Sequence, residues 1–144
     1  MRLWHKDLLP VLPRKQLLSQ WRECCCIARN IAVNGTPNHI LVNKIMDYPI
    51  EHFYRYGCRV YNFMIGRGYK VEWDRFDKWF DVVFTDEYID ADKIFTGWHN
   101  DRYLMQCFYN LQEKYDCGGI TDTEWQRIRI KMEEMKYEYL RTVG

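Results

Sequence analysis

Apolar residues recur every three or four positions in the segment bounded by Pro13 and Gly35, which is the spacing of one face of an α-helix. The apolar side carries Leu17, Trp21, Cys24, Cys25, Ala28, Ile31 and Ala32. Proline is favoured in the first turn of a helix and glycine just past its end, so a helix is predicted from about Pro13 to Asn34. Pro10 and Pro13 bracket an expected extended N-terminal arm, and a loop is expected over 36–39.

Three more segments show helical spacing in the middle of the chain. Residues 48–67 are apolar around most of their circumference, which predicts a helix in the centre of a bundle. Residues 73–84 form a shorter amphipathic stretch, and residues 98–116 a long one that ends before Gly118-Gly119. These segments lack the alternation of paired strands, so each is predicted to be helical.

The last helix has the clearest local signal of the chain. Thr121 and Glu124 form a capping box, in which each side chain satisfies an unpaired amide of the first turn. Apolar residues from Trp125 to Tyr139 then repeat at three and four positions, as expected for core packing. The predicted fold class is therefore all-α, a single compact helical bundle-like domain of about four to five helices over residues 1–144.

Composition narrows the class of protein. The chain has 144 residues, of which 47% are hydrophobic and 17% aromatic, enough for a real core and too many for a disordered protein. A net charge of +1 excludes a strongly basic, histone-like binder but allows a local basic face. No apolar run approaches the ~18 residues of a membrane helix, and no apolar segment of a secretory signal follows the first residues. We expect no membrane association.

The six cysteines do not have the spacing of a metal site or of a disulfide framework. Cys24–Cys26 are consecutive, Cys58, Cys107 and Cys117 are isolated, and no Cys-x-x-Cys occurs. The four histidines form no pair at ligand spacing. We therefore expect free, mostly buried thiols in a reducing cytoplasm, without a metal or another cofactor.

A basic stripe is expected on the polar side of the first helix. Lys15, Arg22 and Arg29 are seven residues apart, so successive members drift by only ~20° around the helix. Such a stripe suits the phosphates of a nucleic acid, but it is also typical of a solvated helix face. Glu23 lies beside it, and spacing alone favours an ordinary surface carboxylate there. The sequence has no glycine-rich phosphate loop and no Ser/His/Asp arrangement that would name an activity.

The segment from Leu12 to Cys24, with its triplet Trp21-Arg22-Glu23, resembles the first helix of the pyrimidine-dimer DNA glycosylases, the phage endonuclease V class. Two weaker similarities follow in the same order. Residues 65–69, Ile-Gly-Arg-Gly-Tyr, are similar to the family's Leu-Lys-Arg-Gly-Phe, and residues 110–114, Asn-Leu-Gln-Glu-Lys, to its Arg-Leu-Asp-Glu-Lys. The opening Met-Arg-Leu-Trp-His-Lys-Asp-Leu is similar to a bacterial and phage branch of this superfamily.

The resemblance implies a DNA repair glycosylase with AP-lyase activity on pyrimidine dimers or abasic sites of double-stranded DNA. In that family the N-terminal α-amine attacks C1′ of the sugar and forms an imine, and a carboxylate assists strand cutting. An α-amine has a reference pKa of about 7.7–8.0, so part of it is uncharged and nucleophilic at pH 7. Carried over, Glu23 is the carboxylate, Arg22 a phosphate or site-organising contact and Lys114 a DNA backbone contact. His39 lies where the family has a Gly-His step near its site.

The chain departs from the family at three positions. The family's nucleophile is a small residue exposed by removal of Met1, whereas Arg2 is large and should hinder that removal. The reacting amine would then be that of Met1, or that of Arg2 after unusual trimming, or the amine chemistry would be lost. Cys26 and Asn110 replace two arginines of the family, which removes positive charge from the expected DNA surface.

Three functions remain open at this point, and the sequence does not predict an oligomeric state. The first is a glycosylase and lyase with Met1 or Arg2 and Glu23 as catalytic residues. Its expected DNA contacts are Lys15, Arg22, Arg29, His39 and Lys114. The second is a catalytically silent DNA- or RNA-binding module on the same fold, and the third a helical protein-interaction or phage accessory factor. The Met1-Arg2 start favours the second, and the near-neutral charge the third.

Overall fold

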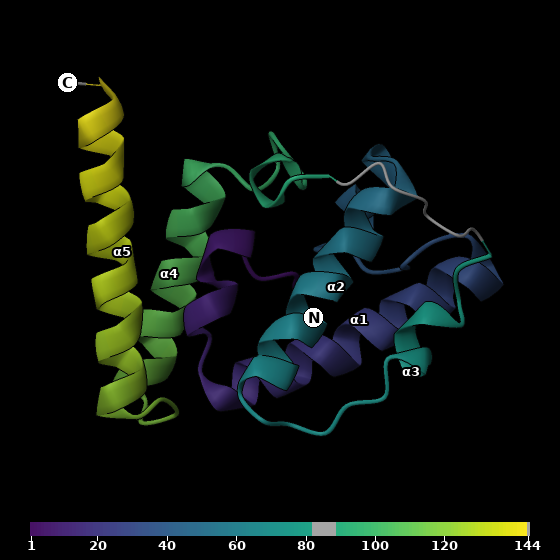
Figure 1. The fold of residues 1–144 in the computed structure, drawn as a ribbon, viewed down its shortest axis with the longest axis horizontal. Coiled ribbons are helices and arrows are strands. Elements are labelled where there is room, and N and C mark those ends of the chain that lie inside the picture. Colours follow the sequence, from purple (N-terminus) through teal and green to yellow (C-terminus); the bar gives the residue numbers. More distant parts are fainter. Residues whose placement is uncertain (82–88, 144) are drawn as a thin grey trace.

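The computed structural model describes the backbone of residues 1–81 and 89–143 and the side chains of residues 1–81 and 89–136. Within these ranges the chain forms α-helices and short 3-10 helices and no β-strand, which confirms the all-α class. Helices α1, Arg14–Asn34, and α2, Ile50–Gly66, pack across each other at the centre of the molecule (Figure 1).

Helix α1 follows its prediction closely. It begins one residue after Pro13, and Gly35 ends it in the left-handed conformation at φ 76°, which glycine adopts at little cost. Most of the predicted apolar side is buried, but Ala32 is exposed, because it lies in the last turn, beyond the part of the helix that the core covers. Gln20 and Ile27 are fully buried instead.

The N-terminal segment is not the extended arm that its prolines suggested. Residues Lys6–Val11 form a 3-10 helix, η1, because the His5 side chain caps it by accepting from the Asp7 amide at 3.1 Å. This compact turn places Leu8 and Leu9 in the core, both fully buried. The helix η1 contacts both α2 and α5.

The predicted helix over 73–84 is wrong in extent. Helix α3 comprises only Asp74–Asp77, and residues 82–84 lie outside the described part of the chain. Phe76 is fully buried, and half-buried Trp79 and Phe80 pack against the core. One helical turn and the turn after it are enough to bring these aromatic residues inward. Two 3-10 helices without a periodic signal, η2 (Asn43–Asp47) and η3 (Ala91–Lys93), were not predicted.

Helices α4, Asp101–Asp116, and α5, Asp122–Val143, lie side by side (Figure 1). The start of α4 is later than predicted, because Asn100 caps it by accepting from the Tyr103 amide at 2.9 Å. The predicted capping box of α5 is present, with reciprocal 3.1 Å contacts between Thr121 and Glu124. Glu124 also accepts from the Arg14 amide at 2.7 Å, which ties α5 to the start of α1. The side chain of Tyr139 lies outside the described residues.

Candidate active site

The first six residues contact α1, α2 and α4 through their backbone, and Gln20 on α1 makes two of these contacts. Its side chain is fully buried. The Gln20 amide oxygen accepts from the Trp4 amide at 2.7 Å, and its amide nitrogen donates to the Arg2 carbonyl at 2.9 Å. The same nitrogen lies 3.4 Å from Glu23 Oε2. One side chain thus fixes residues 2 and 4 beside the carboxylate.

Two tyrosines hold the other side of this segment. The hydroxyl of fully buried Tyr56 on α2 donates to the Trp4 carbonyl at 2.6 Å and lies 2.9 Å from the Gln20 amide oxygen. The hydroxyl of Tyr103 on α4 donates to the Leu3 carbonyl. Burial raises the pKa of both hydroxyls, so they remain proton donors at neutral pH.

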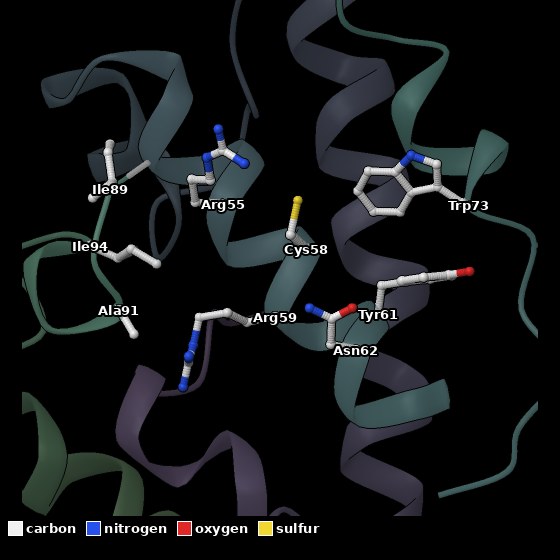
Figure 2. Close-up of a pocket in the computed structure, with 9 residues that line it drawn as sticks. All are labelled: Arg55, Cys58, Arg59, Tyr61, Asn62, Trp73, Ile89, Ala91 and Ile94. Carbon is white, nitrogen blue, oxygen red and sulfur yellow. The ribbon is translucent and has the colours of Figure 1, made fainter. Parts of the chain in front are cut away.

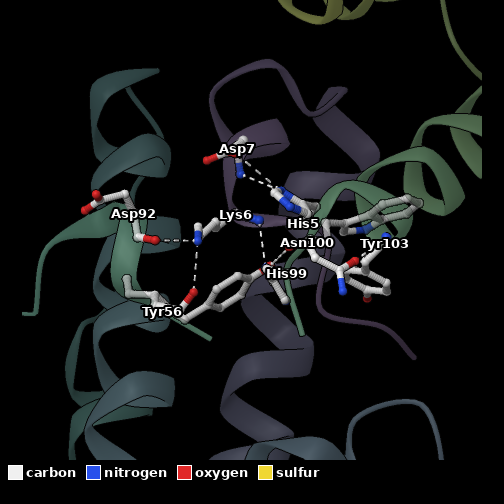
Figure 3. Close-up of polar contacts among 10 residues, drawn as sticks. His5, Lys6, Asp7, Tyr56, Asp92, His99, Asn100 and Tyr103 are labelled. Atoms are coloured by element: carbon white, nitrogen blue, oxygen red, sulfur yellow. Dashed lines mark hydrogen bonds and ion pairs between the residues drawn. The ribbon is translucent and has the colours of Figure 1, made fainter. Parts of the chain in front are cut away.

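A buried polar cluster anchors the end of the segment (Figure 3). The Lys6 amide donates to His99 Nδ1 at 3.0 Å, and the Lys6 ammonium donates to the carbonyls of Asp92 and Ile94 at 2.9 and 3.1 Å. Burial lowers the pKa of His99 to about 2, so its imidazole is neutral and Nδ1 is free to accept. The ring of His5 stacks on that of His99 at 5.1 Å. The backbone is therefore held from residue 2 to residue 6, which preorganises the N-terminus.

This framework places the backbone nitrogen of Arg2 at the Glu23 carboxylate. The Arg2 nitrogen donates to Glu23 Oε2 at 3.4 Å. Both residues line a cavity of about 360 Å³ at the start of the chain. The lining consists of Met1, Arg2, Trp4, Lys15, Gln16, Ser19, Glu23, Leu41, Asn110 and Lys114. The fold thus brings α1, α4 and the loop after α1 to the N-terminal residues.

Five of the residues singled out in the sequence meet in this cavity. Met1, Arg2 and Glu23 lie there with two lysines, Lys15 from α1 and Lys114 from α4, which are 99 positions apart in the chain. Two ammonium groups in the lining of a cavity that also contains a carboxylate and a backbone nitrogen suit the binding of a polyanion there.

The remaining predicted DNA contacts lie outside the cavity lining. Arg22 and Arg29 are exposed on α1, as the basic stripe predicted. His39 is half-buried in the loop after α1, where its Nδ1 accepts from the Leu41 amide at 3.3 Å. Sequence analysis missed Gln20, for which the only signal was an amide side chain between Leu17 and Trp21 on a buried helix face.

A second cavity, of about 380 Å³, lies along α2 (Figure 2). Arg55, Cys58, Arg59 and Asn62 line it from successive turns, and Trp73 faces them. Its described lining contains no carboxylate and no residue of the first cavity. It therefore lacks the pairing of a backbone nitrogen with a carboxylate that the N-terminal cavity has.

The six cysteines are free thiols. Cys24 and Cys107 are buried, whereas Cys26 and Cys117 are exposed, so the expectation of mostly buried thiols holds for only some of them. Burial raises the pKa of Cys25 and of Cys58 to about 11, which keeps these two protonated at neutral pH.

Among the described residues, no three His, Cys, Asp or Glu side chains lie close enough together to hold a metal ion. Nor is any described helix both long and apolar enough to span a membrane.

Comparison with known proteins gives one result that bears on this site. No curated protein sequence and no solved structure has significant similarity to the chain. The family model described as pyrimidine dimer DNA glycosylase matches residues 1–77. This range is more than half of the 144 residues and includes Arg2, Gln20 and Glu23. The family resemblance of the first helix is thus confirmed, and with it a DNA repair class and a DNA substrate: the chain belongs to the pyrimidine dimer DNA glycosylase family.

Proposed function

We propose that this single-domain chain removes pyrimidine dimers or cuts abasic sites in double-stranded DNA, as a glycosylase with AP-lyase activity. An N-terminal amine is the nucleophile and Glu23 the assisting carboxylate. One observation carries the proposal: the Arg2 nitrogen lies 3.4 Å from Glu23 Oε2 in a cavity that Lys15 and Lys114 also line. We place the reaction in the cytoplasm, where free thiols stay reduced.

The proposed lyase reaction at an abasic site has three steps. The amine attacks the C1′ aldehyde of the open sugar, and the oxygen leaves as water to give an imine. Glu23 then removes a proton from C2′, and the electron pair expels the 3′ phosphate, which cuts the strand. Hydrolysis of the imine regenerates the amine. On a dimer, the same attack at C1′ would first break the glycosidic bond, and the base would leave with a proton.

Between the two amines, the geometry favours that of Arg2. Its nitrogen is the one that donates to Glu23, and the Gln20 contact to the Arg2 carbonyl holds the same residue. Removal of Met1 would turn this amide nitrogen into a primary amine without moving it. Met1 itself lines the cavity and is 40% exposed, so its removal by the unusual trimming that Arg2 requires would leave the Arg2 amine in the cavity.

The lysines supply the proposed DNA contact. Lys15 and Lys114 flank the cavity, and exposed Arg22 and Arg29 continue the positive charge along α1. Each phosphate contact releases counterions, so binding should weaken steeply as salt rises. His39 acts through the loop that it stabilises, since its Nδ1 already accepts from Leu41.

Borohydride trapping tests this proposal directly. The protein is mixed with a duplex that holds one abasic site, reduced, and analysed by intact mass and peptide mapping. We expect an adduct on residue 2, or on residue 1 if Met1 is retained. Glu23→Gln should keep DNA binding and lower strand cutting by about 10²–10⁴-fold.

Glu133→Gln is the matched control, because Glu133 is exposed on α5, outside the cavity, and should leave cutting unchanged. The absence of an adduct in a folded protein, or equal cutting by Glu23→Gln and wild type, would refute the lyase. DNA binding that survives such a result would point to a silent binding module on the same fold.

A further inference from the structure

Two large apolar side chains protrude from the loop between α1 and η2. Ile40 is 84% exposed and Leu41 50% exposed. Scattered exposed apolar residues are ordinary, whereas contiguous exposed apolar surface marks places where proteins bind other molecules.

This tip is held in place from both sides. Val42, directly after it, and Ile45 in η2 are buried in the core. The His39 amide donates to the Asn43 side chain at 3.0 Å, and the His39 carbonyl accepts from the amides of Val42 and Asn43 at 3.0 and 2.9 Å. Ile40 and Leu41 therefore stand on a closed turn that keeps them outside the core.

The tip reaches the cavity already described through Leu41. Leu41 lines it together with Arg2, Glu23 and the two lysines, Lys15 and Lys114. An exposed apolar side chain next to two lysines fits a surface on which apolar stacked bases are bordered by phosphates. Duplex DNA offers both parts together, because its stacked bases are apolar and its regularly spaced phosphates match the lysines.

We propose that Ile40 and Leu41 form an apolar wedge that enters the base stack of duplex DNA beside the damaged nucleotide. The inference rests on the proposed function, because the wedge would fill the space left when a nucleotide moves into the cavity at Glu23. Opening a base step costs a few kcal/mol, and inserted Ile or Leu side chains offset part of this cost. The wedge should therefore raise the rate of strand cutting on duplex DNA but not on single-stranded DNA, which has no base stack for it to enter.

The test compares duplex and single-stranded substrates. Strand cutting is measured for wild type and Ile40→Ser on an abasic site in each form, and the result is the ratio of the two rates. We expect Ile40→Ser to lower the duplex-to-single-strand ratio by about tenfold or more, equivalent to about 1.4 kcal/mol. Ile40→Phe, which keeps an apolar tip, should restore it. The control is Ile130→Ser, an equally drastic change at an exposed residue of α5, which should leave the ratio unchanged.

A binding measurement separates the wedge from the chemistry. With 2-aminopurine next to the abasic site, unstacking by wild type should raise its fluorescence, and Ile40→Ser should give a smaller rise at saturating protein. If trapping and cutting persist but Ile40→Ser changes neither the duplex-to-single-strand rate ratio nor the fluorescence rise, the wedge is refuted. If the protein forms no imine but its fluorescence rise still depends on Ile40, the wedge proposal is supported and only the lyase proposal is refuted. Self-association that Ile40→Ser abolishes, without an effect on DNA, would assign the tip to a second copy instead.

Discussion

Replacement of Gln20 by Met tests whether the buried amide positions the N-terminus. Met has nearly the shape of Gln and fills irregular space well, so the substitution removes hydrogen bonds without opening a large cavity. The Trp4 amide loses its 2.7 Å acceptor, and the Arg2 carbonyl loses its 2.9 Å donor. Trp4 is only 6% exposed, so water cannot readily replace the lost partner.

The expected loss of stability follows from these two groups. A buried polar group without a partner costs about 1–3 kcal/mol. The Trp4 amide bears this cost in full, whereas half-buried Arg2 can recover part of it from solvent. We expect Gln20→Met to lower the free energy of unfolding by about 2–4 kcal/mol, which a domain with about 5–15 kcal/mol survives.

The effect on catalysis should be larger than the effect on binding. If Arg2 shifts by about 1 Å from Glu23, the reaction should slow by about 10²-fold, because reacting groups must be held in near-attack geometry. Urea unfolding and single-turnover cutting of abasic duplex, at several DNA concentrations, measure the two effects. Gln126→Met, at an exposed position of α5, is the control.

A third variant distinguishes positioning from general destabilisation. Tyr56→Phe removes the hydroxyl that donates to the Trp4 carbonyl, so it loosens the same residue from α2. Its effect and that of Gln20→Met should be non-additive, because both act on Trp4. A Gln20→Met protein that unfolds at the wild-type urea concentration, or that cuts DNA at the wild-type rate, would refute the argument.

Three further predictions concern other parts of the fold. Gly57→Ala should destabilise by about 1–3 kcal/mol or more in urea unfolding, because its Cβ would overlap the ring of fully buried Phe76. Glu124→Ala should cost about 1–2 kcal/mol in the same assay, since it loses the cap of α5 and the contact to the Arg14 amide, and Glu124→Gln should cost less. His99 has a pKa of about 2 when folded and 6.5 as a reference, so below pH 6.5 the unfolded chain binds the extra proton and stability falls by up to about 1.4 kcal/mol per pH unit. His99→Gln should therefore show a shallower loss of stability between pH 6 and pH 4, and equal slopes would contradict this assignment.

The sequence predicted helix ends where local chemistry determines them. Gly35 ends α1 and the Thr121 capping box begins α5, because turn conformation and side-chain caps act within a few residues. The prediction from sequence failed where aromatic residues at helical spacing are buried without a long helix. The spacing of apolar residues around Phe76 predicted a helix to residue 84, but a single helical turn already places the Phe76 ring against Gly57.

The candidate site was only partly accessible to sequence reasoning. Spacing alone left Glu23 as a surface carboxylate, and only family resemblance gave it a chemical role. The meeting of Lys15 and Lys114 depends on how α4 packs against the N-terminal segment, which no local pattern encodes. Gln20 was missed for the same reason, since its partners lie at residues 2, 4 and 56.

The limit of the family match divides the site into two parts. The match ends at residue 77, so it contains Arg2, Glu23 and the Gln20 contacts that hold them, but neither Asn110 nor Lys114. Both α4 residues nevertheless line the same cavity. The Arg2 nitrogen and the Glu23 carboxylate therefore come from the part of the chain that the family model matches, and the α4 residues of the cavity lining come from the part outside the match. If the proposed function is right, substitutions of Asn110 or Lys114 should alter which lesion is accepted more than the reaction at C1′, because neither residue supplies the proposed amine or the Glu23 carboxylate.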